Sequence, residues 1–227
     1  MNLNDMAFPI IVNTNTTHIG SDNTSHSINL STSSVGDLII VFFTCDGKSI
    51  TTSIDTGASG VNWTKLNETS GATNTSSAFY KIAESSNVLT LSTSSLQQST
   101  AISYSISNHG NTVPVIQSAF GDSININPPA ITPLYTTRDY LFIVYGATDG
   151  SVVASSAPTN FIGLITVTGS SDGSSSSSAY RNLTRDASLY DPGPFTSATE
   201  QWVAFTICVD PGSPTGIGIN NIAYYNI

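Results

Sequence analysis

Few side chains in this sequence are of the types that carry catalysis or hold metals, and they lie far apart. The three histidines are His18, His26 and His109, all in polar stretches typical of exposed loops. His18 and His26 are near enough in sequence to share a metal ion. We nevertheless expect both to be exposed loop residues that bind none.

The acidic residues do not form the pattern of an acid–base site. Glycoside hydrolysis requires two facing carboxylates, and nothing in the sequence places any two of the three glutamates together. Asp46, Asp149 and Asp172 each precede a glycine, where turn formation accounts for them. No zinc-protease, nucleophile-elbow or phosphate-loop motif occurs. We therefore expect no enzyme activity, no metal and no cofactor, with one Ca²⁺ held by loop aspartates as the alternative.

The two cysteines, Cys45 and Cys208, are too few for a disulfide framework or a cysteine zinc site. Cys45 ends an apolar run at 37–45, and Cys208 lies near the end of another at 202–209. In a jelly-roll sandwich these runs would be the early and late central strands, which pair. We therefore predict that the two thiols are neighbours in one sheet. They should be buried, and reduced because the protein is expected to be made in a reducing cytoplasm.

Two aromatic residues are candidates for stacking on a sugar ring. Trp63 lies in residues 61–66 and Tyr190 in residues 188–192, both next to turn-forming stretches. Aromatic side chains on exposed loops bind the faces of sugars in this way, so Trp63 and Tyr190 are candidate ligand contacts. Packing in the core, together with Val61 and Leu66, is the favoured interpretation for Trp63, and core packing is an equal alternative for Tyr190.

The polar part of the composition is unusual. Only 9% of the 227 residues are charged, against about 25% in an ordinary soluble domain. Ser, Thr and Asn supply the polar surface, and the 39% hydrophobic content favours a folded chain over disorder. The net charge of −9 reflects only six Lys and Arg residues, and these are scattered. Nucleic acids and anionic membranes require clustered bases, so we expect neither as a partner.

The first residues contain neither a basic segment nor a long apolar segment, so we expect no secretion signal. No apolar run approaches the ~20 residues of a membrane span. A virus particle accounts for a chain that is made in a cytoplasm but has the polar surface of extracellular β-proteins. An unconventional secretion route or a removed secretion signal would account for it too. We therefore expect synthesis in a host cytoplasm and function on the extracellular virion.

The patterns of apolar residues predict strands throughout the chain. Ile102, Tyr104 and Ile106 alternate with serines, which predicts a strand with one buried face. The runs at 38–43 and 140–145 are apolar on both faces and indicate central strands covered on each side. Connections with Asp-Gly turns are too short for helical crossovers, so the sheets should be antiparallel. The expected fold class is all-β, an antiparallel β-sandwich that is jelly-roll-like.

A single domain, residues 1–227, accounts for the sequence, because no linker, internal repeat or heptad pattern divides it. Residues 169–178 end in five serines and are expected to form a long exposed loop, and residues 93–99 at most a turn of helix. Residues 1–9 and 212–227 have the weakest core pattern and are interpreted as arms or edge strands. Candidate protein contacts in the second arm are Ile222, Tyr224, Tyr225 and Ile227.

An ordered set of features extends over most of the sequence. It begins with Gly36-Asp37-Leu38 opening a strand that ends in Cys45-Asp46-Gly47, an Asn-Trp-Thr-x-Leu turn at 62–66, and an aromatic-basic strand at 78–83. It continues with Pro128-Pro129, a buried strand at 141–145, Ala-Pro-Thr-Asn-Phe at 157–161 and a Trp-led strand ending at Pro211. Together these features resemble a β-sandwich module that recurs in virion proteins of tailed bacteriophages. The resemblance covers roughly residues 30–212, and the sparse arginine departs from the usual pattern.

The resemblance implies a structural or adhesive role and carries over no site residues. A single-domain chain fits a capsid decoration (cement) protein that binds the major capsid protein on the outer capsid surface. We expect a homo-oligomer, with a trimer as the working assumption. The alternative is a receptor- or glycan-binding domain of a tail fibre or adhesin. A secreted carbohydrate-active enzyme is disfavoured by the scarcity of carboxylates.

Overall fold

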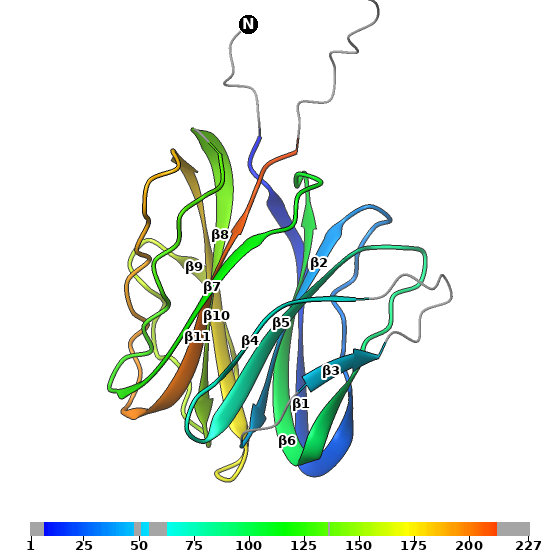
Figure 1. The fold of residues 1–227 in the computed structure, drawn as a ribbon, viewed down its shortest axis with the longest axis vertical. Coiled ribbons are helices and arrows are strands. Elements are labelled where there is room, and N and C mark those ends of the chain that lie inside the picture. The colour runs from blue at the N-terminus through cyan, green and yellow to red at the C-terminus, as the bar shows by residue number, and fades with distance from the viewer. Residues whose placement is uncertain (1–6, 48–50, 55–62, 136, 213–227) are drawn as a thin grey trace, which may run out of the picture.

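The computed structural model describes residues 7–47, 51–54, 63–135 and 137–212, and the regular elements in them are eleven strands. They are β1 (Ile10–Ser27), β2 (Leu38–Asp46), β3 (Thr51–Ile54), β4 (Thr64–Ser70), β5 (Asn74–Ile82), β6 (Thr90–Ser107), β7 (Val115–Ser123), β8 (Arg138–Asp149), β9 (Ile162–Val167), β10 (Ser174–Arg185) and β11 (Glu200–Val209). One sheet has the order β1-β6-β2-β5-β4 with β3 beside β6, and the other has the order β7-β11-β8-β10-β9. The two antiparallel sheets pack face to face (Figure 1), which confirms the predicted all-β sandwich.

The central strands of the two sheets are β2 and β8, and both are apolar on both faces. Every residue at 38–45 and at 140–148 is buried. Their inward side chains join an apolar cluster between the sheets, and their outward side chains join a second and a third cluster on the outer faces. The prediction that both runs are covered on each side is therefore confirmed.

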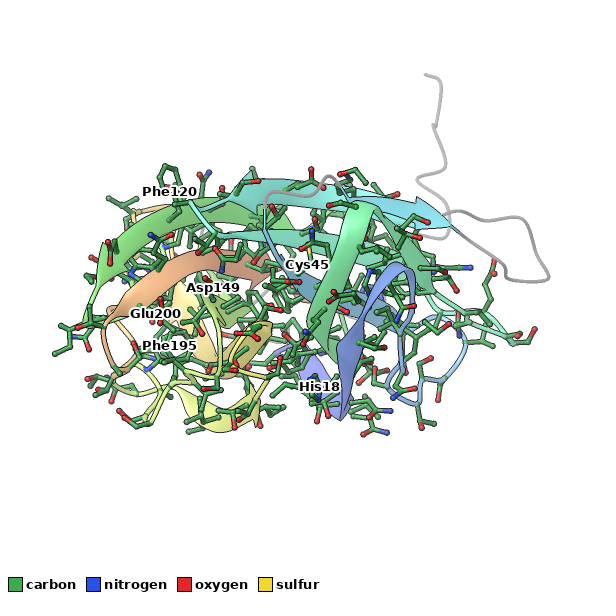
Figure 2. All side chains as sticks on the ribbon, turned by 90° about the horizontal axis from the view of Figure 1, so that it is seen from below. His18, Cys45, Phe120, Asp149, Phe195 and Glu200 are labelled. Carbon is green, nitrogen blue, oxygen red and sulfur yellow. The ribbon has the colours of Figure 1, made fainter. Side chains whose placement is uncertain are left out.

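Aromatic rings join the two sheets at their centres, where side chains fill the space between the layers (Figure 2). Phe42 of β2 stacks on Tyr145 of β8 with ring centroids 4.6 Å apart and an interplanar angle of 7°. The ring centroids of Tyr104 and Phe205 each lie 6.3 Å from that of Phe42. An aromatic pair contributes roughly 0.5–1.5 kcal/mol beyond its burial, so this stack stabilises the contact between the sheets.

The five serines at 174–178 do not form a loop. They are the first half of β10 and are buried. Because β10 lies between β8 and β9, its backbone is paired on both sides. Ser175 Oγ donates to the carbonyl oxygen of Gly150, and Ser177 Oγ accepts a hydrogen bond from the amide of Ala154. Both serines thus bind loops that cover the outer face. The expectation of an exposed loop was wrong because these polar side chains find partners inside the fold.

A group of hydroxyls joins the two sheets beside the aromatic rings. The Tyr145 hydroxyl lies 2.5 Å from Thr44 Oγ1 and 2.7 Å from Ser176 Oγ. The Tyr104 hydroxyl donates to Ser178 Oγ at 2.7 Å. A buried hydroxyl without a partner costs about 1–3 kcal/mol, so these bonds allow the serine-rich strand to lie in the core.

The two sheets are built to the same plan. In each, the first strand of that half of the chain lies at one edge, the last strand lies beside it and the second strand is central. The remaining two strands form a hairpin at the other edge. β1, β2, β4, β5 and β6 thus correspond to β7, β8, β9, β10 and β11. In its strand order the chain is thus an internal structural duplication, whereas the sequence analysis identified no repeated segment.

The edge hairpins of the two halves also share an irregularity. One extra residue interrupts the pairing between Lys65 and Asn67 in β4, and another between Ile162 and Ile165 in β9. A β-bulge at the same place in both edge strands supports the correspondence. Residues that match in this register are Trp63 with Phe161, Leu66 with Leu164, Gly71 with Gly169, Tyr80 with Tyr180 and Lys81 with Arg181.

An approximate twofold axis relates the two halves. Across the interior β2 contacts β8, β5 contacts β11 and β6 contacts β10, while at the rims β4 contacts β7 and β1 contacts β9. Exchanging the halves maps each of these contacts onto another or onto itself. The axis therefore passes between β2 and β8, and the sandwich has two equivalent rims.

The chain completes one sheet before it begins the other, and this separates the cysteines. Cys45 lies on β2 and Cys208 on β11, in different sheets and in different outer clusters. The prediction that they are neighbours in one sheet is wrong, because the jelly-roll pairing of these strands does not form. Both thiols are free and buried, as predicted. Burial raises the pKa of the Cys45 thiol to about 12.

Residues 93–99 also differ from expectation. They belong to β6, an 18-residue strand, and make no turn of helix. The first part of β6 pairs with β3 and with the end of β1, and these distant partners decide its conformation.

Candidate functional site

Tyr190 is part of the apolar cluster outside the second sheet and is not an exposed stacking platform. Its side chain is 7% exposed, and its ring centroid lies 4.6 Å from that of Phe142. Arg185 covers the ring at 5.1 Å, and Arg181 donates to the phenol oxygen at 3.2 Å. The backbone of Tyr190 pairs with that of Ile131 through two hydrogen bonds. This pairing, which the sequence does not reveal, draws the ring inward.

Trp63 is also buried, in the cluster outside the first sheet. Its indole Nε1 donates to the carbonyl oxygen of Val88 at 2.9 Å. Of the two interpretations that the sequence left open for Trp63, the structure supports core packing. The structure brings neither Trp63 nor Tyr190 to a surface where a sugar ring could stack, and the two rings lie outside different sheets.

The two histidines of β1 have different surroundings. His18 is exposed (Figure 2), but His26 is fully buried near the end of the strand. Its ring nitrogens lie 2.9 Å from Ser99 Oγ and 3.1 Å from Thr93 Oγ1. Burial lowers the pKa of His26. The expectation that His26 is exposed was wrong, because β1 continues to Ser27 and carries this side chain to the covered face.

Metal-ligating side chains do not converge in the part of the chain that the structure describes. There, no group of three or more His, Cys, Asp or Glu side chains could hold a metal ion. Asp149, the last residue of β8, pairs with Ser174, the first residue of β10, next to a turn.

The two described ends of the chain meet at one end of the sandwich (Figure 1), here called the terminal pole and formed by residues 7–9, 108–112, 138 and 210–212. Asn108 Nδ2 donates to the carbonyl oxygens of Ala7 and Phe8 at 2.6 and 2.9 Å. The amide of Gly212 donates to the carbonyl oxygen of Asn108 at 2.9 Å. Asn108 has a φ of 53°, a left-handed conformation that asparagine tolerates better than most residues.

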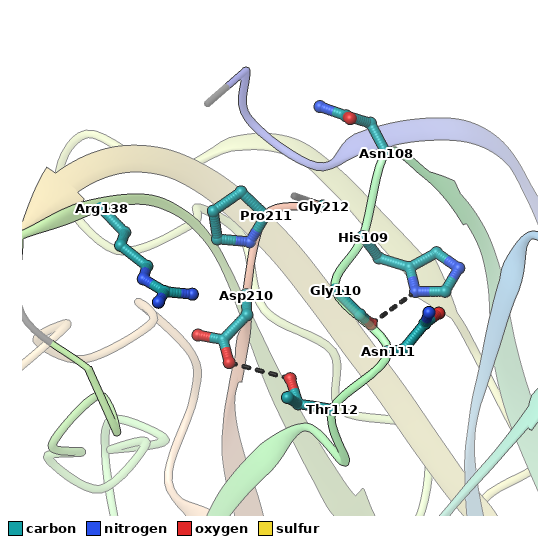
Figure 3. Close-up of a pocket in the computed structure, with 9 residues that line it drawn as sticks. All are labelled: Asn108, His109, Gly110, Asn111, Thr112, Arg138, Asp210, Pro211 and Gly212. Carbon is teal, nitrogen blue, oxygen red and sulfur yellow. Dashed lines mark hydrogen bonds between the residues drawn. The ribbon is translucent and has the colours of Figure 1, made fainter. Parts of the chain in front are cut away.

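A hollow of about 560 Å³ opens at the terminal pole (Figure 3). Asp210 lines it, mostly buried, and accepts a hydrogen bond from Thr112 Oγ1 at 2.8 Å. Burial raises the pKa of Asp210, whereas the Thr112 hydrogen bond and the positive charge of Arg138 oppose that rise. The Arg138 guanidinium carbon lies 4.3 Å from the ring centroid of Tyr135.

The segment between β6 and β7 closes the other side of the hollow. His109 Nδ1 lies 2.8 Å from the carbonyl oxygen of Gly110, and its Nε2 lies 2.9 Å from that of Gly36. The amide of Gly110 donates to the carbonyl oxygen of Asp210 at 2.8 Å. These bonds fasten three backbone segments together. The terminal pole thus presents hydrogen-bonding groups around the carboxyl group of Asp210 and the guanidinium of Arg138. This arrangement is suited to binding a polar partner.

Sequence reasoning missed the residues that build the terminal pole. Asn108, His109 and Gly110 form a turn-like triplet, which was the one available signal. Arg138 and Asp210 are distant in sequence, and no local pattern marks either. The candidate protein contacts Ile222, Tyr224, Tyr225 and Ile227 lie outside the described residues, in the segment that follows Gly212.

No family model matches the chain, and no curated protein or solved structure matches it. The described ranges contain no helix that is long and apolar enough to cross a membrane. The function is therefore argued from the sequence and from the geometry of the terminal pole.

Proposed function

We propose that this chain is a non-enzymatic structural protein of a bacteriophage particle, a capsid decoration protein that binds the outer surface formed by the major capsid protein. The terminal pole carries the proposal. Residues 7–8 and Gly212 are both held there by Asn108, so the described chain begins and ends at this pole, to which residues 1–6 and 213–227 are attached. Two segments that leave one end of a sandwich are suited to anchor it on a surface.

The chemistry of the second segment supports an anchoring role. Residues 213–227 contain no Asp, Glu, Lys or Arg and include Ile222, Tyr224, Tyr225 and Ile227. Stable protein contacts usually bury at least ~1,200 Å² in total, and here most of that burial must be apolar and hydroxyl-rich. Such a contact depends little on long-range charge, so salt should weaken it little.

The receptor- or glycan-binding alternative is weakened by the position of its two aromatic residues. Trp63 and Tyr190 are only 4% and 7% exposed, so neither presents a face on which a sugar could stack. Phe120, on β7, is an exposed aromatic at 65% (Figure 2), and it is not one of the residues that the sequence indicated for stacking. The decoration function keeps its support, because it needs a broad contact and no aromatic platform.

The test is binding of the purified chain to phage particles assembled without it. Bound copies are counted after sedimentation at low salt and at about 1 M salt, where the Debye length falls to about 3 Å. We expect a fixed number of copies per particle and nearly equal retention at both salt concentrations. A variant lacking residues 220–227 should be retained less at both.

Adsorption to host cells provides the opposing measurement. If the chain coats cells but does not sediment with particles, the decoration function is wrong and the adhesin alternative replaces it. Binding to particles that disappears at high salt would contradict the apolar contact and point to a charged one.

A further inference from the structure

The two rims of the sandwich are equivalent by the internal duplication, yet only one of them is closed. At the closed rim, β4 of the first sheet meets β7 of the second. Thr69 Oγ1 donates to Ser118 Oγ at 2.7 Å, and Asn67 Nδ2 donates to the same oxygen at 3.4 Å. Side chains of both edge strands therefore join the sheets along this rim.

At the other rim, β1 also contacts β9, but the seam between these two strands is more open. No hydrogen bond joins β1 to β9 in the chain as described, and a groove of about 350 Å³ runs between residues 11–14 and residues 163–165. Gly163 stands where the matching strand has Lys65, with a φ of +65°. A Cβ on Gly163 would come within 2.4 Å of the Tyr180 ring. Because Gly163 has no side chain, its backbone can lie directly against the Tyr180 ring at the base of the groove.

The strands that border the seam lack the protection normal for sheet edges. Free edges are usually guarded by charged side chains, which discourage pairing with another strand. β4 has Lys65 and Glu68, and β7 has Asp122. β9 has no charged residue, and β1 has none before Asp22. The exposed fractions of Val12 and Ile162 are 54% and 60%, so the unguarded edges also present apolar side chains.

We propose that the seam between β1 and β9 receives residues 213–227 of a second copy of this chain as an added strand. This segment matches the seam in having no charge, and it alternates apolar residues at Ile217 and Ile219 and again at Ile222 and Tyr224. Extended, it reaches about 50 Å at roughly 3.3 Å per residue. Main-chain pairing with an unguarded edge supplies affinity, and alternate side chains supply specificity.

The direction of the bordering strands selects a second copy over the same chain. β1 begins at the terminal pole, where Asn108 holds Phe8. β9 runs opposite to β11, which ends at that pole. Both strands therefore run away from the pole, and the chain's own C-terminal segment would enter parallel to both. Antiparallel pairing is the more stable ladder, and it requires a segment that enters from the far end, from another copy.

The inference concerns contacts between copies of this chain and is tested without particles. On a particle, the seam of a neighbouring copy and the capsid surface would compete for residues 213–227. Segment-into-seam contacts are heterologous, so they close into rings or continue as chains. Two variants separate the two halves of the contact. Val12→Lys with Ile162→Lys blocks the seam and keeps the segment, whereas deletion of residues 217–227 removes the segment and keeps the seam. Phe120→Lys, at an exposed apolar position on the closed rim, is the matched control.

Molar mass is measured by light scattering across a range of concentrations, with thermal unfolding as the check that each variant folds. The unaltered chain and Phe120→Lys should self-associate, whereas the seam variant and the deletion should each remain monomeric. Mixed in equal amounts, those two variants should form a 1:1 dimer, because one supplies the segment and the other the seam. A mixture that stays monomeric would falsify the inference, as would an unaltered chain that is monomeric at all concentrations. Loss of thermal stability on deletion without a change in mass would assign the seam to the chain's own segment.

Discussion

At the scale of single residues, the interior of this protein is held by rings and hydroxyls that satisfy each other across two sheets. Phe42 stacks on Tyr145, and the Tyr145 hydroxyl bonds Thr44 and Ser176. One residue thus contributes both to apolar packing and to the polar network. The low charge of the chain is compatible with this interior, because Ser and Thr side chains can be buried once they are paired.

Truncation of Phe42 tests the contribution of the ring stack. Phe42→Ala should lower the free energy of unfolding by roughly 3–5 kcal/mol, because a fully buried ring is replaced by a cavity. Asp149→Asn, at the end of β8, is the comparison and should change it by no more than about 0.5 kcal/mol. Urea denaturation measures both. A large loss at Asp149 together with sensitivity to EDTA would show that a metal is bound there.

His26 should make stability depend on pH. Burial lowers its pKa below the usual 6.5, so the unfolded chain takes up a proton at a higher pH than the folded chain. Its stabilising contribution is therefore present above about pH 6.5 and is lost as the pH falls through the lowered pKa. His26→Gln should flatten that part of the curve in urea titrations between about pH 7 and pH 5. An unchanged slope in the variant would mean that other groups cause the dependence.

At the scale of elements, the repeated bulge in β4 and β9 gives each half of the sandwich an edge strand of the same shape. The two bulges differ in what occupies them. Gly163 in β9 lies against Tyr180, whereas β4 has Lys65 at the matching position. A bulge bends its strand and increases the local twist. Each bulge therefore shapes the rim at which its edge strand lies.

Two glycine substitutions separate backbone strain from crowding at the bulge. Gly163 and Gly193 both have a positive φ, but a Cβ would meet the Tyr180 ring only at Gly163. Gly193→Ala should therefore cost about 1–2 kcal/mol, the penalty of a left-handed conformation alone. Gly163→Ala should cost about 1–3 kcal/mol more, because the added methyl overpacks the ring. Thermal unfolding of both variants checks the order, and equal costs would contradict the close contact with Tyr180.

At the scale of the whole molecule, the two halves have the same strand order and enclose a single apolar interior. The cluster between the sheets takes residues from both, including Leu38, Tyr104, Ile143 and Phe205. Neither sheet can bury its inner face without the other, so the halves are expected to fold and unfold together. The terminal pole adds to this, because it joins the chain ends to the segment that connects the halves.

The two tryptophans report on cooperation between the halves. Trp63 lies in the first half and Trp202 in the second, each in the outer cluster of its own sheet. Variants that keep one tryptophan, Trp202→Phe and Trp63→Phe, allow the fluorescence of each half to be followed separately. In urea both signals should change together with the circular dichroism of the same variant, as for two-state unfolding. Distinct midpoints within one variant would show that the halves unfold as separate units.

The sequence by itself determined the local character of the chain. Apolar runs on both faces marked β2 and β8 as central strands, and the alternation of Ile102, Tyr104 and Ile106 marked the inner face of β6, because strand side chains alternate with a period of two. An antiparallel sandwich followed from these strands and from short connections. The burial of both cysteines followed from the apolar runs that contain them.

Only the tertiary structure decided which strands are neighbours. Pairing joins residues that are distant in sequence, and no local pattern specifies the partner. The assignment of Cys45 and Cys208 to different sheets, the burial of His26 and Tyr190 and the strand formed by Ser174–Ser178 all depend on such partners. The same holds for the duplication, which is established by the common strand order of the two sheets. Side-chain alternation fixes what a segment can be, and long-range packing fixes where it lies.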